Sequence, residues 1–168
     1  MMLNMALEYT IAYLLLGGNL GDRERNLQEA IHLIEDKIGE ICTVSSVYET
    51  AAWGKTDQPA FLNQALTVKT RLTALEVLEN ALEIERLLGR IRKDKWGERL
   101  IDIDIILFGD EIIDIENKLQ VPHPQMQNRR FVMMPLAEIA PNVIHPLLGK
   151  TISSIEENIT DNLNVKKL

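Results

Sequence analysis

Cysteine is nearly absent from this sequence: Cys42 is the one cysteine among 168 residues. A single thiol cannot close a disulfide within the chain, and no histidine near it supplies the spacing of a metal site. Disulfide-based scaffolds and cysteine metal centres are therefore excluded. A reducing, cytoplasmic setting is expected.

Long apolar runs are also missing. The run at residues 11–16 is far shorter than the roughly 18 residues that a membrane span needs, and no basic region precedes it. We therefore predict a buried strand at this position and no membrane association.

The chain has no excess of positive charge, because its formal net charge is -7. A broad surface for nucleic acid or anionic membrane would have to outweigh that acidity, so neither partner is expected. Any site for an anion must be local.

Repeats, low-complexity stretches and linkers rich in Pro, Gly and Ser are absent from the sequence. With 46% hydrophobic and 26% charged residues, the composition is typical of one globular domain with a single core. We therefore predict one domain, residues 1–168.

Periodicity and turn residues predict the order of the elements. Asp22 is a candidate N-cap for a first helix, and Thr73 with Glu76 forms a candidate capping box for a second helix that ends at Gly89. The three-and-four spacing of apolar residues predicts buried faces at Leu27, Ala30, Ile31, Ile34 and Ile38 and at Leu78, Ala81 and Leu82. Strands are predicted at residues 11–16, 43–50, 65–70 and 101–108.

The order β-α-β-β-α-β predicts an α+β fold with a ferredoxin-like βαββαβ core. Two helices would cover one face of an antiparallel sheet, and the other face would be free for a ligand. After this core we predict C-terminal additions: a short strand at residues 112–115, a helix at 131–139 and a helix at 152–159.

Two acidic residues stand in the last strand of the predicted core. Asp102 and Asp104 alternate with isoleucines, so we expect the isoleucines in the core and both carboxylates on the opposite face, about 6–7 Å apart. The pair either binds a metal or consists of solvated acids on an edge strand. The pattern alone favours solvated acids.

A basic segment leads into this pair. Residues 90–99 contain five basic and two acidic side chains, a local charge of +3 in an acidic chain. Carboxylates that hold divalent cations beside arginines would neutralise a polyphosphate and the charge that develops during its transfer. The composition of this segment alone favours a solvated surface loop between a helix and a strand.

Glu85 lies on the buried face of the second predicted helix, near the C-terminus, where the helix dipole disfavours an anion. A compensating contact is therefore expected. An ion pair with Arg90 or Arg92 and a direct contact with a ligand are both open.

Several motifs together resemble one enzyme family. They are W-G-E-R-L-I-D-I-D-I-I-L-F-G, G-R-I-R-K before it and V-P-H-P-Q-M-Q-N-R-R-F after it, within a stretch from L-G-G-N-L-G-D to A-P-N-V-I-H-P. In this order they resemble the 6-hydroxymethyl-7,8-dihydropterin pyrophosphokinases of folate biosynthesis, over nearly the whole chain. The resemblance implies transfer of a pyrophosphoryl group from MgATP to the hydroxymethyl group of the pterin, which leaves AMP.

The resemblance also implies roles for individual residues. Asp102 and Asp104 are expected to hold two Mg²⁺ ions, with Arg90 and Arg99 as the catalytic arginines, because a guanidinium suits phosphate oxygens. ATP is expected to contact Glu85, Arg92, Trp96, Arg99, Ile105, Lys118, His123 and Arg129. The pterin is expected to contact Thr50, Ala51, Trp53, Phe61, Asn63, Trp96, Asp102 and Phe131.

Other interpretations exist for some of these residues. Without the resemblance, Phe61 and Phe131 would be ordinary core residues, and Asn63 would be a turn residue. His123 would be a surface or hydrogen-bonded residue.

The sequence departs from the family's usual pattern at four positions. Gly18 stands where Ser is usual, Ala51 where Pro is common, Leu82 where a polar contact to ATP is frequent, and Lys118 where Arg is common. None of them belongs to the predicted metal pair. They put details of the adenine and pterin contacts in question.

Two alternatives from other classes share the predicted topology. A small-molecule-sensing module would not need the aspartates and arginines together. An RNA-binding module is disfavoured by the acidic total and by the lack of paired aromatic residues in the strands. The expected partners are ATP and the pterin, bound by a monomer.

Overall fold

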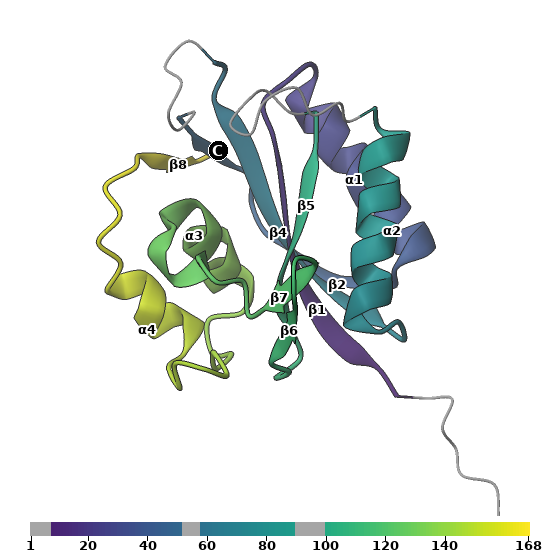
Figure 1. The fold of residues 1–168 in the computed structure, drawn as a ribbon. Coiled ribbons are helices and arrows are strands. Elements are labelled where there is room, and N and C mark those ends of the chain that lie inside the picture. The colour runs from purple at the N-terminus through teal and green to yellow at the C-terminus, as the bar shows by residue number, and fades with distance from the viewer. Residues whose placement is uncertain (1–7, 52–57, 90–99) are drawn as a thin grey trace, which may run out of the picture.

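The computed structural model describes residues 8–51, 58–89 and 100–168. Within them, a six-stranded sheet has the order β5-β1-β4-β3-β8, and β2 also pairs with β4 (Figure 1). All of its pairings are antiparallel, as predicted. Its strands are β1 (Thr10–Gly18), β2 (Glu40–Val44), β3 (Tyr48–Thr50), β4 (Phe61–Thr70), β5 (Asp102–Phe108) and β8 (Val165–Lys167).

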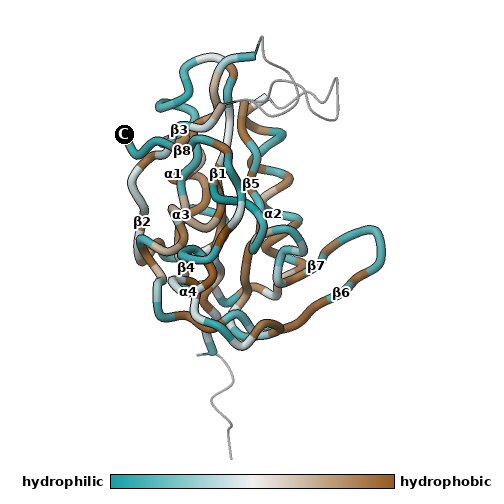
Figure 2. The backbone as a smooth tube through the Cα atoms, turned by 90° about the vertical axis from the view of Figure 1, so that its left-hand side faces the viewer, coloured by the Kyte–Doolittle hydropathy of each residue, from teal (hydrophilic) through white to brown (hydrophobic). Residues whose placement is uncertain are grey.

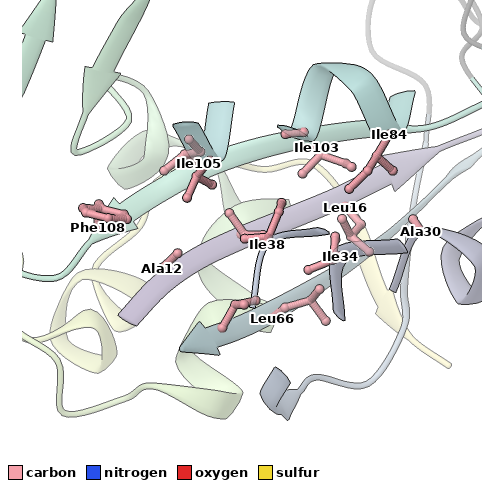
Figure 3. Close-up of a cluster of buried hydrophobic side chains, with 14 of the residues drawn as sticks. Ala12, Leu16, Ala30, Ile34, Ile38, Leu66, Ile84, Ile103, Ile105 and Phe108 are labelled. Carbon is pink, nitrogen blue, oxygen red and sulfur yellow. The ribbon is translucent and has the colours of Figure 1, made fainter. Parts of the chain in front are cut away.

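Two helices, α1 (Arg23–Lys37) and α2 (Ala74–Leu87), cover one face of the sheet. Asp22 accepts a hydrogen bond from the N–H of Arg25 at 3.2 Å, and Thr73 and Glu76 form the predicted capping box. The apolar sides of both helices pack on the isoleucines and leucines of β1, β4 and β5 (Figure 3). Both predicted helices and their starts are confirmed.

One residue predicted for the buried face of α2 lies outside it. Leu82 is 51% exposed, because the buried stripe of α2 runs through Ala74, Val77, Ala81 and Ile84. Each residue of an α-helix is rotated by about 100° from the one before it, so the neighbour of buried Ala81 points away from the sheet.

Helices cover much of the second face of the sheet, so the prediction that this face is free for a ligand is wrong for the covered part. α3 (Arg130–Ile139) and α4 (Ile152–Glu157) pack on it through a second apolar cluster that includes Leu15, Ile106 and Met133. The reason lies in β1 and β5, which present apolar side chains on both faces. A sheet of this kind has to be covered on both sides.

The predicted strand at residues 43–50 is two strands, β2 and β3. They separate at Ser45, whose N–H donates to the carbonyl of Ala65 at 2.9 Å and whose hydroxyl accepts from the N–H of Ala65, also at 2.9 Å. These contacts separate β2 from β3, although the sequence pattern of a strand continues through this point.

A small hairpin follows β5. It consists of β6 (Ile113–Ile115), near the strand predicted at 112–115, and β7 (Leu119–Val121), which was not predicted. Figure 2 shows this hairpin standing away from the rest of the chain with a hydrophilic tip. A one-turn 3₁₀ helix, η2 (Met126–Asn128), then leads into α3.

Glu138 of α3 joins this helix to the edge of the sheet formed by β3 and β8. Its carboxylate accepts from the N–H of Ser46 at 2.8 Å and from the hydroxyl of Tyr48 at 2.6 Å, and it lies 3.6 Å from Lys167 of β8. Burial would raise the pKa of Glu138, but the hydrogen bonds from Tyr48 and Ser46 hold this pKa below its usual value.

No helix in the described part of the chain combines the length and the apolarity required to cross a membrane.

Candidate active site

Asp102 and Asp104 lie at the beginning of β5, on the face opposite the isoleucines. Ile103 and Ile105 are buried in the core under α1 and α2, whereas Asp102 is half-buried and Asp104 is exposed. In the register with β1, Asp102 is opposite Gly17 and Asp104 is opposite Leu15. The predicted alternation is therefore confirmed, and it places both carboxylates on one side of one strand.

Glu85 of α2 contacts the backbone between these two aspartates. Its side chain is buried, and one carboxylate oxygen accepts from the N–H of Ile103 at 2.8 Å. The contact joins the last turn of α2 to β5. The alternative ion pair of Glu85 with Arg90 or Arg92 involves residues outside the described part of the chain.

A cavity of about 350 Å³ opens on the side of β5 that carries the aspartates. We call it the first cavity. Six residues predicted to contact the pterin are brought together in its lining: Thr50, Ala51, Phe61, Asn63, Asp102 and Phe131. Asp104 and Arg129 also line it, so it is a mixed space with aromatic, amide and charged walls.

Asn63 is held inside the first cavity by its neighbours. Its amide donates to the hydroxyl of Thr50 at 3.2 Å, and both side chains are buried. Gly17 lies beside it on β1, and a Cβ atom at Gly17 would be only 2.8 Å from the Asn63 side-chain oxygen. The missing side chain of Gly17 therefore leaves the space that the amide of Asn63 occupies.

A second cavity, of about 810 Å³, lies between β5 and the β6–β7 hairpin. It is lined by three residues predicted to contact ATP, Ile105, Lys118 and His123. Asp104 lines this cavity as well as the first one. The exposed aspartate therefore stands where the two cavities meet.

His123 occupies a half-buried position in the wall of the second cavity. Burial and, as the smaller cause, the nearby positive charge of Arg129 together lower its pKa to about 4. The imidazole is therefore neutral near pH 7, and its Nδ1 accepts from the N–H of Gln125 at 3.2 Å. A neutral ring adds no positive charge toward a phosphate and can act as a hydrogen-bonding partner.

Arg129 belongs to the lining of the first cavity and not to that of the second. Its guanidinium is 5.8 Å from the centre of the Phe131 ring. It was predicted as an ATP contact, but the structure places it with the residues predicted for the pterin.

Five of the predicted site residues lie outside the described part of the chain: Trp53, Arg90, Arg92, Trp96 and Arg99. Other residues line the first cavity without having been predicted. Gln125 and Asn128 lie within the quoted V-P-H-P-Q-M-Q-N-R-R-F motif, which could have indicated them, whereas Asp161 and Leu163 carry no local signal.

The two aspartates supply hard oxygen donors of the kind that Mg²⁺ prefers. Among residues 8–51, 58–89 and 100–168, no group of three or more His, Cys, Asp or Glu side chains is arranged to hold a metal. Mg²⁺ usually binds through one or two carboxylates, with waters and substrate phosphates as its other ligands. The pair fits a metal bound in that manner.

The family model for 7,8-dihydro-6-hydroxymethylpterin-pyrophosphokinase (HPPK) matches residues 13–141. The chain belongs to the HPPK family. The family predicted from the sequence motifs is thereby confirmed.

Curated relatives in the HPPK family extend over most of the chain. The 2-amino-4-hydroxy-6-hydroxymethyldihydropteridine pyrophosphokinase of Bacillus subtilis is 48% identical over 134 residues, which are 79% of this chain and 80% of the relative. The protein of the same name from Aquifex aeolicus is 44% identical over 148 residues, 88% of this chain and 91% of the relative.

Solved structures agree at the level of the fold. The crystal structure of wild-type Plasmodium falciparum HPPK-DHPS with pteroate has a TM-score of 0.72 at 20% identity and covers 92% of this chain. The match spans 43% of that longer, two-enzyme chain. The same wild-type protein with pterin and p-hydroxybenzoate has a TM-score of 0.71, also at 20% identity, and covers 92% of this chain and 42% of that one.

The environment of His123 generates a prediction for its protonation. In an NMR titration, His123 should have a pKa of about 4, and Arg129→Gln should raise this pKa without restoring 6.5, because burial is the larger cause. Since the folded state keeps His123 neutral while the unfolded chain binds a proton, the contribution of His123 to stability should decrease as the pH falls from 6.5 toward 4. Variants His32→Gln and His145→Gln assign the three signals. A His123 pKa near 6.5 in the wild type would contradict the assigned burial.

Proposed function

We propose that the chain transfers a pyrophosphoryl group from MgATP to 6-hydroxymethyl-7,8-dihydropterin in folate biosynthesis. Membership of the HPPK family supports this reaction and the assignment as an ATP-dependent enzyme. The observation that carries the placement of the substrates is the pair of cavities that share Asp104.

The first cavity is the proposed pterin compartment. A flat heteroaromatic ring can stack on Phe61 or Phe131, and the amide of Asn63 offers a donor and an acceptor to the edge of the ring. Thr50 fixes the orientation of that amide. Trp53 and Trp96, which lie outside the described residues, are proposed as further contacts.

The second cavity is the proposed ATP compartment. Ile105, Lys118 and His123 line it, and its larger volume suits a nucleotide. Glu85, Arg92, Trp96, Arg99 and Arg129 are proposed as further contacts to ATP. Lys118 provides a flexible positive charge in the place where the family commonly has arginine.

The reaction joins the two compartments at the aspartates. The hydroxymethyl oxygen forms a bond to the β-phosphorus and releases its proton to solvent, the bond from that phosphorus to the bridging oxygen of the α-phosphate breaks, and AMP leaves with that oxygen. Asp102 and Asp104 would hold two Mg²⁺ ions, which supply charge neutralisation for the triphosphate. Arg90 and Arg99 are proposed to stabilise the transferred group, because arginine binds phosphate oxygens in a bidentate manner.

The finer points of the architecture are part of the same proposal. The strand order and the two helices on one face support a ferredoxin-like βαββαβ core within one domain, residues 1–168. A monomer in the cytoplasm, with no nucleic-acid or membrane partner, is the proposed form of the protein.

The nucleotide product tests the reaction. Purified protein incubated with MgATP and 6-hydroxymethyl-7,8-dihydropterin should release AMP in step with pterin diphosphate, as separated by ion-exchange chromatography. ADP as the nucleotide product would mean transfer of a single phosphoryl group and would contradict the proposal. Omission of the pterin controls for simple hydrolysis of ATP.

Asp104→Asn tests the role of the aspartate shared by both cavities. The substitution keeps the size of the side chain and removes its charge, so kcat should fall by at least about 100-fold while the unfolding transition stays in place. Asp36→Asn, an exposed residue of α1, is the matched control and should leave kcat unchanged. Turnover near the wild-type value in Asp104→Asn would refute the metal role.

Gly17→Ala tests the position of Asn63 in the pterin compartment. The new Cβ would lie 2.8 Å from the Asn63 side-chain oxygen and should displace the amide, so that the KM for the pterin rises. An increase of about tenfold, equivalent to roughly 1.4 kcal/mol, is expected, with the KM for ATP unchanged. In an Asn63→Ala background the effect of Gly17→Ala should disappear, because both changes remove the same contact. Additive effects of the two substitutions on the KM for the pterin would contradict the idea that Gly17→Ala acts by displacing Asn63.

A further inference from the structure

The C-terminal segment of the chain reaches the proposed pterin compartment. Asp161 and Leu163 line the first cavity together with Asp102 and Phe131. Both residues lie beyond residue 141, where the match to the family model ends. A wall of the cavity is therefore built by a part of the chain that the family match does not include.

Asp161 is bound to the first turn of α3. One carboxylate oxygen accepts from the N–H of Arg130 at 2.9 Å, and the other accepts from the N–H of Leu163 at 3.0 Å. Arg130 is the first residue of α3, and the N-cap residue Arg129 provides no side-chain hydrogen bond to the helix. Asp161 thus supplies an acceptor that the helix start lacks, with a charge that the helix dipole favours at this end.

The peptide group held by Asp161 lies between two residues of the first cavity. Arg129 precedes Arg130 and Phe131 follows it, and both line the cavity. The guanidinium of Arg129 also lies near the ring of Phe131, 5.8 Å from its centre. The hydrogen bond from Arg130 to Asp161 therefore restrains the backbone from which both side chains extend.

The segment is also fixed at its other end. β8 pairs with β3, which places Val165 opposite Thr50, another residue of the first cavity. The N–H of Leu168 donates to the carbonyl of Val47 at 2.9 Å. Residues 161–168, which we call the tail, are thus attached to α3 on one side and to β3 on the other. The tail contributes Leu163 to the first cavity.

We propose that Asp161 is a positioning residue for pterin binding, which acts through Arg129 and Phe131, and that Leu163 forms an apolar part of the wall of the pterin compartment. This inference rests on the proposed function, because it assumes that the first cavity binds the pterin. The inference adds Asp161 and Leu163, which lie beyond the family match, to the proposed substrate site.

Binding measurements on four variants test this inference. The Kd of the pterin is measured by fluorescence in the presence of a non-reacting ATP analogue, and the Kd of the analogue is measured alone. Asp161→Ala and Leu163→Ala should each raise the Kd of the pterin about tenfold, while the Kd of the analogue changes less than threefold. Asp161→Asn keeps one acceptor oxygen and should lie between the wild type and Asp161→Ala. Asn162→Ala, an exposed neighbour that does not line the cavity, is the matched control and should bind both ligands like the wild type.

A double-variant cycle separates positioning from general stability. In a Phe131→Ala background, Asp161→Ala should add little further loss of pterin affinity, because the two changes affect the same contact. Should Asp161→Ala fail to fold, Asp161→Asn tests the positioning role of Asp161 and Leu163→Ala tests the wall.

The possible failures are distinguishable. A wild-type protein that binds no pterin overturns the proposed function and this inference with it. Intact binding by the wild type and by both Asp161→Ala and Leu163→Ala overturns the inference alone. Equal losses for the pterin and the ATP analogue, with a lower Tm, would also overturn it, because that result indicates a structural role only.

Discussion

The hydrogen bond between Glu85 and the N–H of Ile103 joins the two layers on which the candidate active site depends. It is buried and 2.8 Å long, and it lies between the two aspartates along β5. A buried carboxylate needs such a partner, because its desolvation would otherwise destabilise the fold. The contact fixes the position of α2 along β5. The isoleucines on either side of Asp104 are buried in the core and so fix which face of the strand each side chain occupies. The direction of both carboxylates follows from these two constraints.

The features predicted from the sequence are those that depend on local pattern. The alternation around Asp102 and Asp104, the cap at Asp22 and the capping box at Thr73 are each determined within a few residues. The division at Ser45 is different, because it depends on Ala65, twenty residues away. The covered second face was missed for a related reason: the apolar residues of β1 on that face gain their partners from α3 and α4, more than one hundred residues later.

In the candidate site, too, some residues are indicated by local motifs and others depend on contacts between distant parts of the chain. The family resemblance indicated part of the lining of both cavities, and the roles of all these residues, like those of Arg90, Arg92, Arg99, Trp53 and Trp96, stay predictions. Asp161 and Leu163 had no motif and no periodicity to indicate them. Their contribution arises from the course of the tail around α3, which no spacing in the sequence predicts.

The tail has a further consequence at the outer edge of the sheet. An unpaired edge strand can add a strand from another molecule, and charged side chains on it discourage this. β8 occupies the edge beside β3 and is only three residues long, with Lys166 and Lys167 both exposed. Two copies that met along this edge would bring their lysines together. The segment that completes the cavity wall thereby also protects the protein against growth of its sheet from one molecule to the next.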